Sequence, residues 1–396
     1  MQYSTRARLL LAGAALSAFA GPALALDGND LVAKINSALA IQGAAGFSAE
    51  KTTVSGSNVT LTNAKMAIEA GKRSLPLGTI KFEGVEEDNG GYTVEKVTFD
   101  NINATADKTV LTASDLSISG LTVPANANGD GLDALLLYDE AHVGKITATV
   151  DGKPAFSIDE TNVTTEIADD NSSVGFDLQV NGIKSDLSVV DDAQAKDTLQ
   201  QLGITSLDGK VAMSGAWTLE DGTLDVDEYA LDFAKVGRLN LAFSISGYTL
   251  DFIKSANETA KAMEANPNKE EAQQAAGLAM LGLMQRLAFN SAEIRFEDAG
   301  ITKKALDYAG KSQGTTGEAM AQMLKGMTPM MLAQYNVPEL QNMVSAAVNT
   351  YLDKPGSFTI TAEPADAVPF PMIMGAAMGA PNTLPKVLGV KVTAND

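Results

Sequence analysis

Few residues in this chain could act as a catalytic nucleophile or a metal ligand. The 396 residues include no Cys and a single His, His142. The lack of Cys excludes disulfides, thiolate zinc sites and Cys nucleophiles, and one His excludes a multi-histidine metal site. We expect His142 to end a short helix and to have a structural role, because the sequence places neither an acid–base partner nor a pocket beside it.

Residues 305–314 match two catalytic patterns, a relaxed Walker A motif and a G-x-S-x-G motif around Ser312. Both motifs need a strand before the loop, and a nucleophile elbow also needs a His further along the chain. Here the preceding residues have helical spacing, and His142 lies upstream. We therefore predict no nucleotide site and no catalytic serine, and we expect Gly310 to cap a helix in the left-handed conformation.

Residues 126–131 follow the first half of an EF-hand loop, with oxygen-bearing side chains at positions one, three and five and Gly at position six. Position twelve is Leu137, where a bidentate Glu should lie, although Asp133 could contribute. A solvated loop before a helix at 132–137 is the favoured interpretation. Whether Asn126–Asp130 binds calcium stays open, and no metal site or cofactor is predicted.

Acidic side chains dominate the charge. With 49 acidic and 29 basic residues the net charge is −20, which argues against nucleic acid and against anionic membrane surfaces. Pairs such as Asp225 and Asp227 are what the wet face of a strand would carry, and sequence does not place two carboxylates across a cleft as a glycosidase requires. We predict no catalytic residue and expect the protein not to be an enzyme.

Methionine is concentrated in the C-terminal part, where twelve of the 15 lie after residue 260. Flexible thioethers fill irregular cores and also suit surfaces that accept varied apolar ligands, and they can bind copper(I). These alternatives stay open. The groove interpretation assigns an apolar ligand-binding site to Met280, Met284, Met320, Met323, Met327 and Met331.

Residues 1–25 have the pattern of a secretory signal peptide. Arg6 and Arg8 precede an apolar run of 12 residues, Leu9–Ala20, which is too short to cross a bilayer because a spanning helix needs about 20 residues. We expect cleavage near Ala25 and a periplasmic or secreted product with 27 basic and 49 acidic side chains, a net charge of −22. The longest later apolar run, Ala275–Met284, is also too short to span.

The elements that must position any site fall into three regions. Residues 26–250 combine a short N-terminal helix with about a dozen alternating apolar and polar runs, which indicate antiparallel strands, and with short helices near 131–140 and 193–202. Residues 251–352 read as helices with one strand near 293–297, and residues 353–396 as returning strands with a Pro/Met/Gly-rich tail. This pattern predicts an α+β fold, mainly antiparallel β, with a large curved or half-barrel sheet and a C-terminal helical layer. One large domain is favoured over two.

Four segments carry a resemblance to a known group of proteins: "NDLVAKINSALAIQG", "VSGSNVTLTNAKM", the strand-DG-strand unit "LDGKVAMSGAWTLEDGTLDVDEYALDFAKVGRLNLAFSISG" and the later "AEIRFEDAGITKKALDYAGKSQG". Over residues 28–310 the layout resembles the AsmA-like and YdgA-like periplasmic envelope proteins of Gram-negative bacteria. The resemblance implies a long, curved antiparallel sheet whose concave apolar side holds lipid, and a role in envelope maintenance. It carries no catalytic residues across. AsmA-like proteins usually keep an N-terminal membrane anchor and are often longer, whereas this chain is expected to be cleaved free.

Together these observations predict an exported, non-enzymatic envelope protein that binds an apolar ligand or a lipid chain in a groove between the sheet and the Met-rich helices. The alternative is a periplasmic protein-interaction or scaffold module that uses an acidic sheet face. Expected partners are a lipid or other apolar ligand and an envelope protein, with no nucleic acid and no transmembrane segment after signal cleavage.

Overall fold

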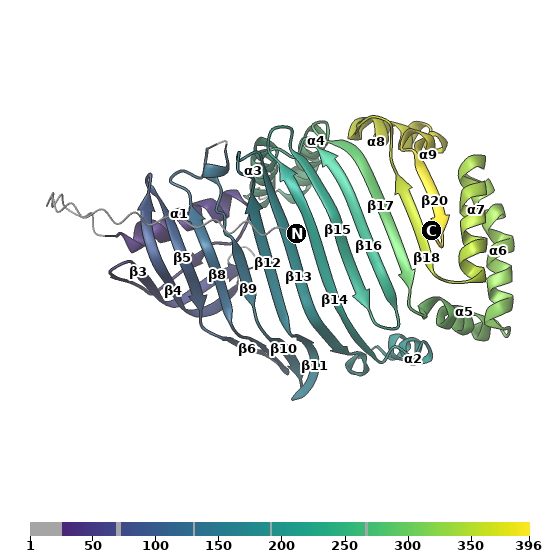
Figure 1. The fold of residues 1–396 in the computed structure, drawn as a ribbon, viewed down its shortest axis with the longest axis horizontal. Helices are drawn as coiled ribbons and strands as arrows, with labels where there is room; N and C mark the ends of the chain where they lie inside the picture. The colour runs from purple at the N-terminus through teal and green to yellow at the C-terminus, as the bar shows by residue number, and fades with distance from the viewer. Residues whose placement is uncertain (1–25, 69–72, 130, 191, 266–267) are drawn as a thin grey trace, which may run out of the picture.

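The structure, a computed structural model, describes residues 26–68, 73–129, 131–190, 192–265 and 268–396 (Figure 1). The predicted signal peptide, residues 1–25, lies outside the described residues. The strands within them form one 20-stranded sheet whose neighbouring strands pair antiparallel. The predicted α+β class with a large, mainly antiparallel sheet is therefore confirmed, and the sheet is open.

The N-terminal part of the sheet follows helix α1 (Gly28–Ile41). Asp27 caps this helix, since its side chain accepts hydrogen bonds from the backbone N–H groups of Asn29 and Asp30. The strands then pair in the order β2–β3–β4–β5–β8–β9, with β1 also against β3. Their bounds are β1 Phe47–Ser48, β2 Lys51–Ser55, β3 Asn58–Ile68, β4 Arg73–Asp88, β5 Gly91–Phe99, β8 Leu116–Val123 and β9 Glu140–Val143.

Four short strands lie next in the chain to β5, β8, β9 and β12, each separated from its neighbour by a break of one or two residues. These short strands pair with one another in the order β6–β7–β10–β11. They are β6 Ile102–Ala106, β7 Thr109–Ala113, β10 Ile146–Val150 and β11 Lys153–Ile158. At the matching level of β13 (Ser173–Asp186) the register shifts next to Gly182, whose φ is +65°. A Cβ there would lie 2.1 Å from the Oδ2 of Asp159, so the bulge requires Gly. Bulges of this kind bend a sheet.

From β12 onward the sheet is a regular meander in which most strands pair with their neighbours along the chain. Short β19 pairs with the start of β17. The bounds are β12 Glu160–Ile167, β14 Ser206–Thr218, β15 Thr223–Phe233, β16 Gly237–Ser246, β17 Ala288–Asp298, β18 Ser357–Ala362, β19 Val368–Pro369 and β20 Val390–Ala394. The strand predicted near 293–297 is the centre of the longer β17.

Most helices after residue 250 lie around the C-terminal part of the sheet, but α3 lies beside β12 and β13, and its Asn257 donates a hydrogen bond to the carbonyl oxygen of Ile41 at the end of α1 (Figure 1). Helices α3 and α4 lie at one end of the strands, α8 and α9 lie at the same end further along, and α6 and α7 lie beside β20. The bounds are α2 Ala193–Gln201, α3 Leu250–Ala265, α4 Lys269–Met284, α5 Ile301–Ser312, α6 Gly317–Ala333, α7 Pro338–Asp353, α8 Phe370–Gly379 and α9 Leu384–Val387. The expected helix break at Asn266–Pro267 falls outside the described residues.

The main hydrophobic core lies under α1. Leu31 and Ile35, which the sequence placed on one face of this helix, are buried against strands β3, β4, β5 and β8. The same cluster of buried side chains includes Val59, Leu61 and Ile80. This core occupies only the N-terminal end of the sheet.

Two local predictions are wrong. The helix expected near 131–140 is only a 3-10 turn, Leu132–Ala134, and His142 lies in strand β9 and not at a helix end. Gly310 lies within α5 and does not cap it, because the helix continues to Ser312. A Cβ at Gly310 would lie 2.6 Å from the backbone of Thr316, so Gly allows the start of α6 to pack closely against α5.

Candidate ligand-binding face

One row of side chains crosses the whole sheet and is entirely apolar. Because side chains alternate between the faces of a strand, residues that pair directly across neighbouring strands share a face. Following the pairs from β2 to β20 through fourteen strands gives what we call the apolar row: Val54, Val59, Phe82, Val97, Ile118, Ala141, Val163, Leu178, Met213, Tyr229, Leu241, Ile294, Ile360 and Val392.

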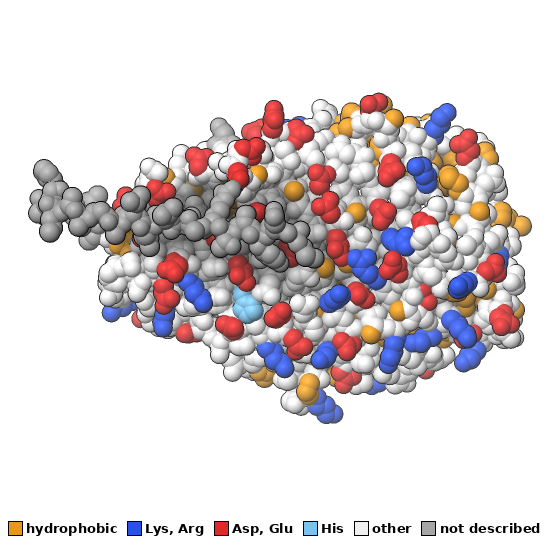
Figure 2. All heavy atoms as spheres, viewed as in Figure 1, with side chains coloured by type: hydrophobic (Ala, Val, Ile, Leu, Met, Phe, Trp, Pro, Cys, Tyr) orange, Lys and Arg blue, Asp and Glu red, His pale blue; other side chains and the backbone are white. Residues whose placement is uncertain are grey.

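The row directly beside it, on the opposite face, is polar except for two alanines. It consists of Thr53, Thr60, Lys81, Thr98, Ser117, His142, Asn162, Gln179, Ala212, Ala230, Asn240, Arg295, Thr359 and Thr393. Figure 2 shows this polar face, with acidic and basic side chains spread over it and the single His near the N-terminal strands. The sheet therefore has one polar and one apolar side along its full width.

The burial of the apolar row changes along its length. Under α1 the exposed fractions of Val59 and Phe82 are 0% and 3%, whereas that of Ile294, in the same row, is 46%. Tyr229 and Ile360 are likewise classed as exposed. Helix α1 thus covers one end of the apolar side. From β8 to β18 the row is half-buried or exposed, and Val392 in β20 is buried again. A large exposed apolar patch marks a binding surface, because isolated exposed residues are normal but contiguous ones are not.

The open part extends over the strands from β12 to β18. We call it the open apolar face, and beside the row it includes Phe176, Val180, Val211, Trp217, Leu224, Leu231, Phe233, Leu239, Phe243, Ile245, Phe289, Phe296 and Phe358. With neighbouring strands about 4.8 Å apart, these seven strands measure about 30 Å across. That width equals the thickness of the hydrocarbon core of a bilayer, about 30 Å.

A cavity lies at one end of the open apolar face. It has a volume of about 200 Å³ and lies between the end of α1, the start of α3 and the loop before β9, with Ile41, Leu135, Trp217 and Ile253 among its lining residues. The indole Nε1 of Trp217 donates a hydrogen bond to the carbonyl oxygen of Tyr248 at 2.8 Å. The only Trp of the chain is thereby fixed where the face meets the cavity.

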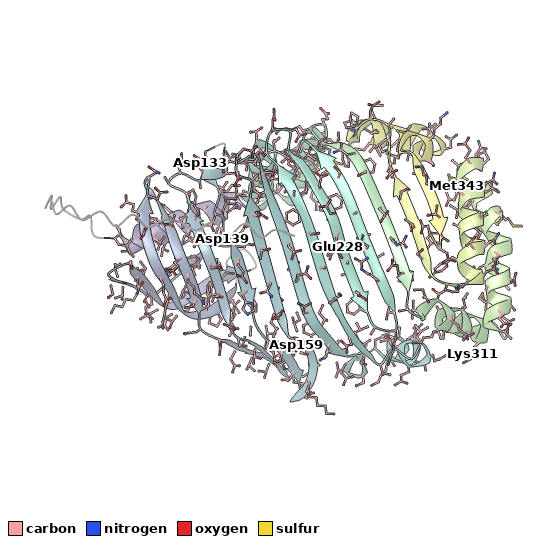
Figure 3. The ribbon with its side chains drawn as sticks, viewed as in Figure 1. Asp133, Asp139, Asp159, Glu228, Lys311 and Met343 are labelled. Atoms are coloured by element: carbon pink, nitrogen blue, oxygen red, sulfur yellow. The ribbon has the colours of Figure 1, made fainter. Side chains whose placement is uncertain are left out.

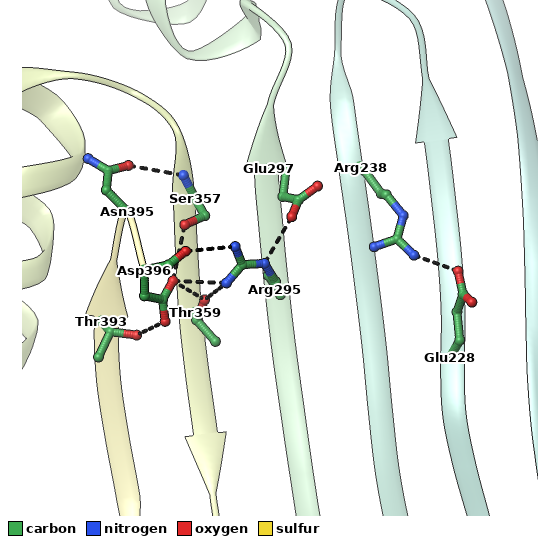
Figure 4. Close-up of polar contacts among 9 residues, drawn as sticks. All are labelled: Glu228, Arg238, Arg295, Glu297, Ser357, Thr359, Thr393, Asn395 and Asp396. Carbon is green, nitrogen blue, oxygen red and sulfur yellow. Dashed lines mark hydrogen bonds and ion pairs between the residues drawn. The ribbon is translucent and has the colours of Figure 1, made fainter.

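The polar face pairs its charges internally at the C-terminal strands (Figure 4). Arg295 contacts Glu297 at 3.0 Å and Asp396 at 2.8 Å. The Asp396 carboxylate also accepts hydrogen bonds from the hydroxyls of Thr393, Ser357 and Thr359. The Thr393 hydroxyl, and then Arg295 and the other two hydroxyls, hold the pKa of Asp396 far below its usual range. On the neighbouring strands Arg238 pairs with Glu228.

The six predicted groove methionines fall into two separate groups. Met280 and Met284 lie on α4, and the other four lie on α6, at a different part of the molecule (Figure 1). Met320 is buried, with an exposed fraction of 4%, and Met284 is half-buried, whereas Met280, Met323, Met327 and Met331 are exposed. The structure therefore does not bring the six together around one groove. The strand residues of the open apolar face, including Met213, were not named as site residues from sequence.

The residues considered for catalysis lie apart. His142 Nδ1 lies 2.6 Å from the Asn162 side-chain oxygen, and its Nε2 lies 3.4 Å from Asp115. Ser312 is exposed, and its hydroxyl donates to the Ala309 carbonyl oxygen at 2.8 Å. The neighbouring Lys311 lies near the C-terminal helices in Figure 3, at the end of the molecule opposite the strands that carry His142.

Within the described part of the chain, no group of three or more His, Asp or Glu side chains could hold a metal ion. Asp130, part of the expected calcium loop, lies outside the described residues. No helix among the described residues is both long and apolar enough to span a bilayer.

A family model described as "Uncharacterized protein" matches residues 230–395. No curated protein matches the chain. The matched segment runs from the middle of β15 to β20, so it includes the C-terminal half of the open apolar face and the helices around it.

Proposed function

We propose that this chain is an exported, non-enzymatic envelope protein that binds the acyl chains of a lipid on the open apolar face. The observation that carries the proposal is the contrast within the apolar row: Val59 and Phe82 are buried under α1, but Ile294 and Ile360, on the same side, are exposed. Covering such a surface with apolar groups removes it from water, which lowers the free energy of the protein.

The chemistry of this face suits hydrocarbon. The side chains of the apolar row offer no hydrogen-bonding group except the Tyr229 hydroxyl, so a ligand that matches them needs no polar contacts. Acyl chains meet this requirement because they carry none. The polar face, in contrast, already pairs Arg295 with Asp396 and Arg238 with Glu228, which favours the apolar side as the ligand site.

A charge placed in the middle of the face tests the proposal. Ile294→Glu puts a carboxylate among the acyl chains, whereas Thr361→Glu adds the same charge on the adjacent strand β18 but on the polar side. Both positions are at the surface, so both variants are expected to fold. We expect the affinity for a fluorescent fatty acid to fall at least about tenfold in Ile294→Glu, since one buried aliphatic side chain contributes that much, and to stay unchanged in Thr361→Glu.

Trp217 offers a second readout in the same titration, because it is the only Trp and adjoins the face. Saturable binding with one or a few fatty acids per protein, retained in native mass spectrometry, would support the proposal. Equal binding by the wild type and Ile294→Glu would refute it.

A further inference from the structure

Two uncharged segments, separated by 85 residues of the chain, meet at one end of the strands. Ala275–Met284 forms the second half of α4, and Phe370–Gly379 forms α8. The backbone N–H of Phe370 donates to the carbonyl oxygen of Leu287 at 3.1 Å, just after α4 ends, and β19 pairs with the start of β17 beside it. Figure 1 shows both helices along the same edge of the sheet. We call the two segments the apolar rim.

The apolar rim is exposed. The exposed fraction of Leu278 is 73% and that of Met378 is 81%, and Met280 and Met372 are also exposed. Figure 2 shows hydrophobic side chains gathered over the edge where α8 lies. A helix that is apolar on all sides is normally buried in a protein core or in lipid. Here the core accounts for only one side of each helix.

The residue types identify what covers the rim. The twenty residues of the two segments are Ala, Gly, Leu, Ile, Met, Phe and Pro, so their side chains carry no hydrogen-bond donor and no acceptor stronger than the weak thioether of Met. Protein–protein interfaces carry about one hydrogen bond per 100–200 Å², whereas hydrocarbon offers none. A side-chain surface without donors or acceptors therefore matches lipid better than protein.

The length of the helices determines how they meet the lipid. Each of the two ten-residue segments is about 15 Å long, half of what a bilayer core requires. Such segments lie in the interface, with their apolar side about 5–10 Å into the boundary between headgroups and acyl chains. The net charge of −20 disfavours anionic headgroups.

We propose that the apolar rim inserts into the interface of a bilayer of neutral, zwitterionic lipids. The rim adjoins the open apolar face, since β17 follows α4 directly and contributes Phe289 to that face. Insertion of the rim would thus place one end of the open apolar face at the membrane surface, where the acyl chains of lipids are available. Membrane docking by the rim is a different property from lipid binding on the open apolar face, and each can be present without the other.

Flotation with vesicles of pure phosphatidylcholine tests the inference, using protein purified from the exported fraction. The wild type should float with the vesicles. The double variant Leu278→Glu/Met378→Glu should show a vesicle partition coefficient at least about tenfold lower, because two buried apolar side chains are replaced by charges. Asn382→Glu is the matched control: it adds a charge just after α8 without removing an apolar group, and it should float as the wild type does.

The outcomes separate this inference from the proposed function. The double rim variant should still bind a soluble fluorescent fatty acid, and Ile294→Glu should still float. A wild type that does not float, or a double variant that floats equally well, would overturn the docking of the rim. Loss of fatty acid binding in Ile294→Glu would stand in either case, because that variant leaves the rim unchanged.

Discussion

Two isoleucines on the same side of the sheet should differ sharply in their contribution to stability. Ile80 lies in β4 under α1 with an exposed fraction of 1%, and Ile294 lies in β17 on the open apolar face with 46%. The substitutions Ile80→Ala and Ile294→Ala remove the same three carbon atoms. A difference between their losses of unfolding free energy therefore reflects how far each side chain is covered by the rest of the protein.

The magnitudes follow from burial. Ile80→Ala leaves a cavity in a closed core, and such substitutions cost about 2–5 kcal/mol of unfolding free energy. Ile294 has neighbours within the sheet but open space above it, so its truncation forms no closed cavity. Only part of the transfer free energy of its side chain is lost, which we expect to cost about 1 kcal/mol.

Urea denaturation of the lipid-free protein at pH 7, followed by far-UV circular dichroism, gives both values. Ligand addition should narrow the difference in stability between the two variants: a bound fatty acid stabilises the wild type by mass action and should stabilise Ile294→Ala less, while Ile80→Ala should gain as much as the wild type does. If Ile294→Ala costs as much as Ile80→Ala without ligand, the apolar side is closed in solution and the reasoning from its exposure fails.

Three further predictions concern the fold. Asp396→Asn should cost about 1 kcal/mol at pH 7, because it weakens the contacts of a partly exposed carboxylate with Arg295 and the neighbouring hydroxyls. The pKa of Asp396 is lower in the folded chain. This contribution is therefore fully present well above the unfolded pKa of about 3.9 and decreases as the pH falls from there through the much lower folded pKa, so the urea midpoints of the variant and the wild type should lie closer together at pH 3 than at pH 7. Asp27→Ala should lower the unfolding free energy by about 1 kcal/mol through loss of the α1 cap, and Asp27→Asn should restore most of it in the same assay; equal losses in both would argue against capping. Gly182→Ala should lower the thermal midpoint because its φ is +65° and the added Cβ would meet Asp159, and an unchanged midpoint would contradict the tight bulge.

The sequence was sufficient to predict the class of the fold. Alternation of apolar and polar residues, such as that around Leu239 and Leu241, requires only a strand with two different faces. This is a local property of the chain, and both residues lie in a paired strand of the structure. The helical face of Leu31 and Ile35 was equally local and is confirmed by their burial. The short apolar run at 132–137 failed because runs of this length fit a helix or a turn equally well.

The site could not be located in the same way, since exposure depends on distant contacts. Ile80 and Phe82 in β4 alternate with polar residues just as Leu239 and Leu241 do in β16, but α1 packs only on the former. Nothing in either strand encodes this difference. The methionines show the same limit, because Met320 is buried and Met323, three residues further along one helix, is exposed.

The meander from β12 to β17 has a consequence for how such a protein can change over time. Each strand there pairs with its neighbours in the chain, so the sheet grows along one dimension as a repeat protein does. Duplication of one hairpin would widen the sheet by about 10 Å and leave every other pairing intact. The size of the ligand that the face can hold therefore depends on the number of hairpins. Evolution can change it by adding or removing one hairpin at a time, and no pocket has to be rebuilt.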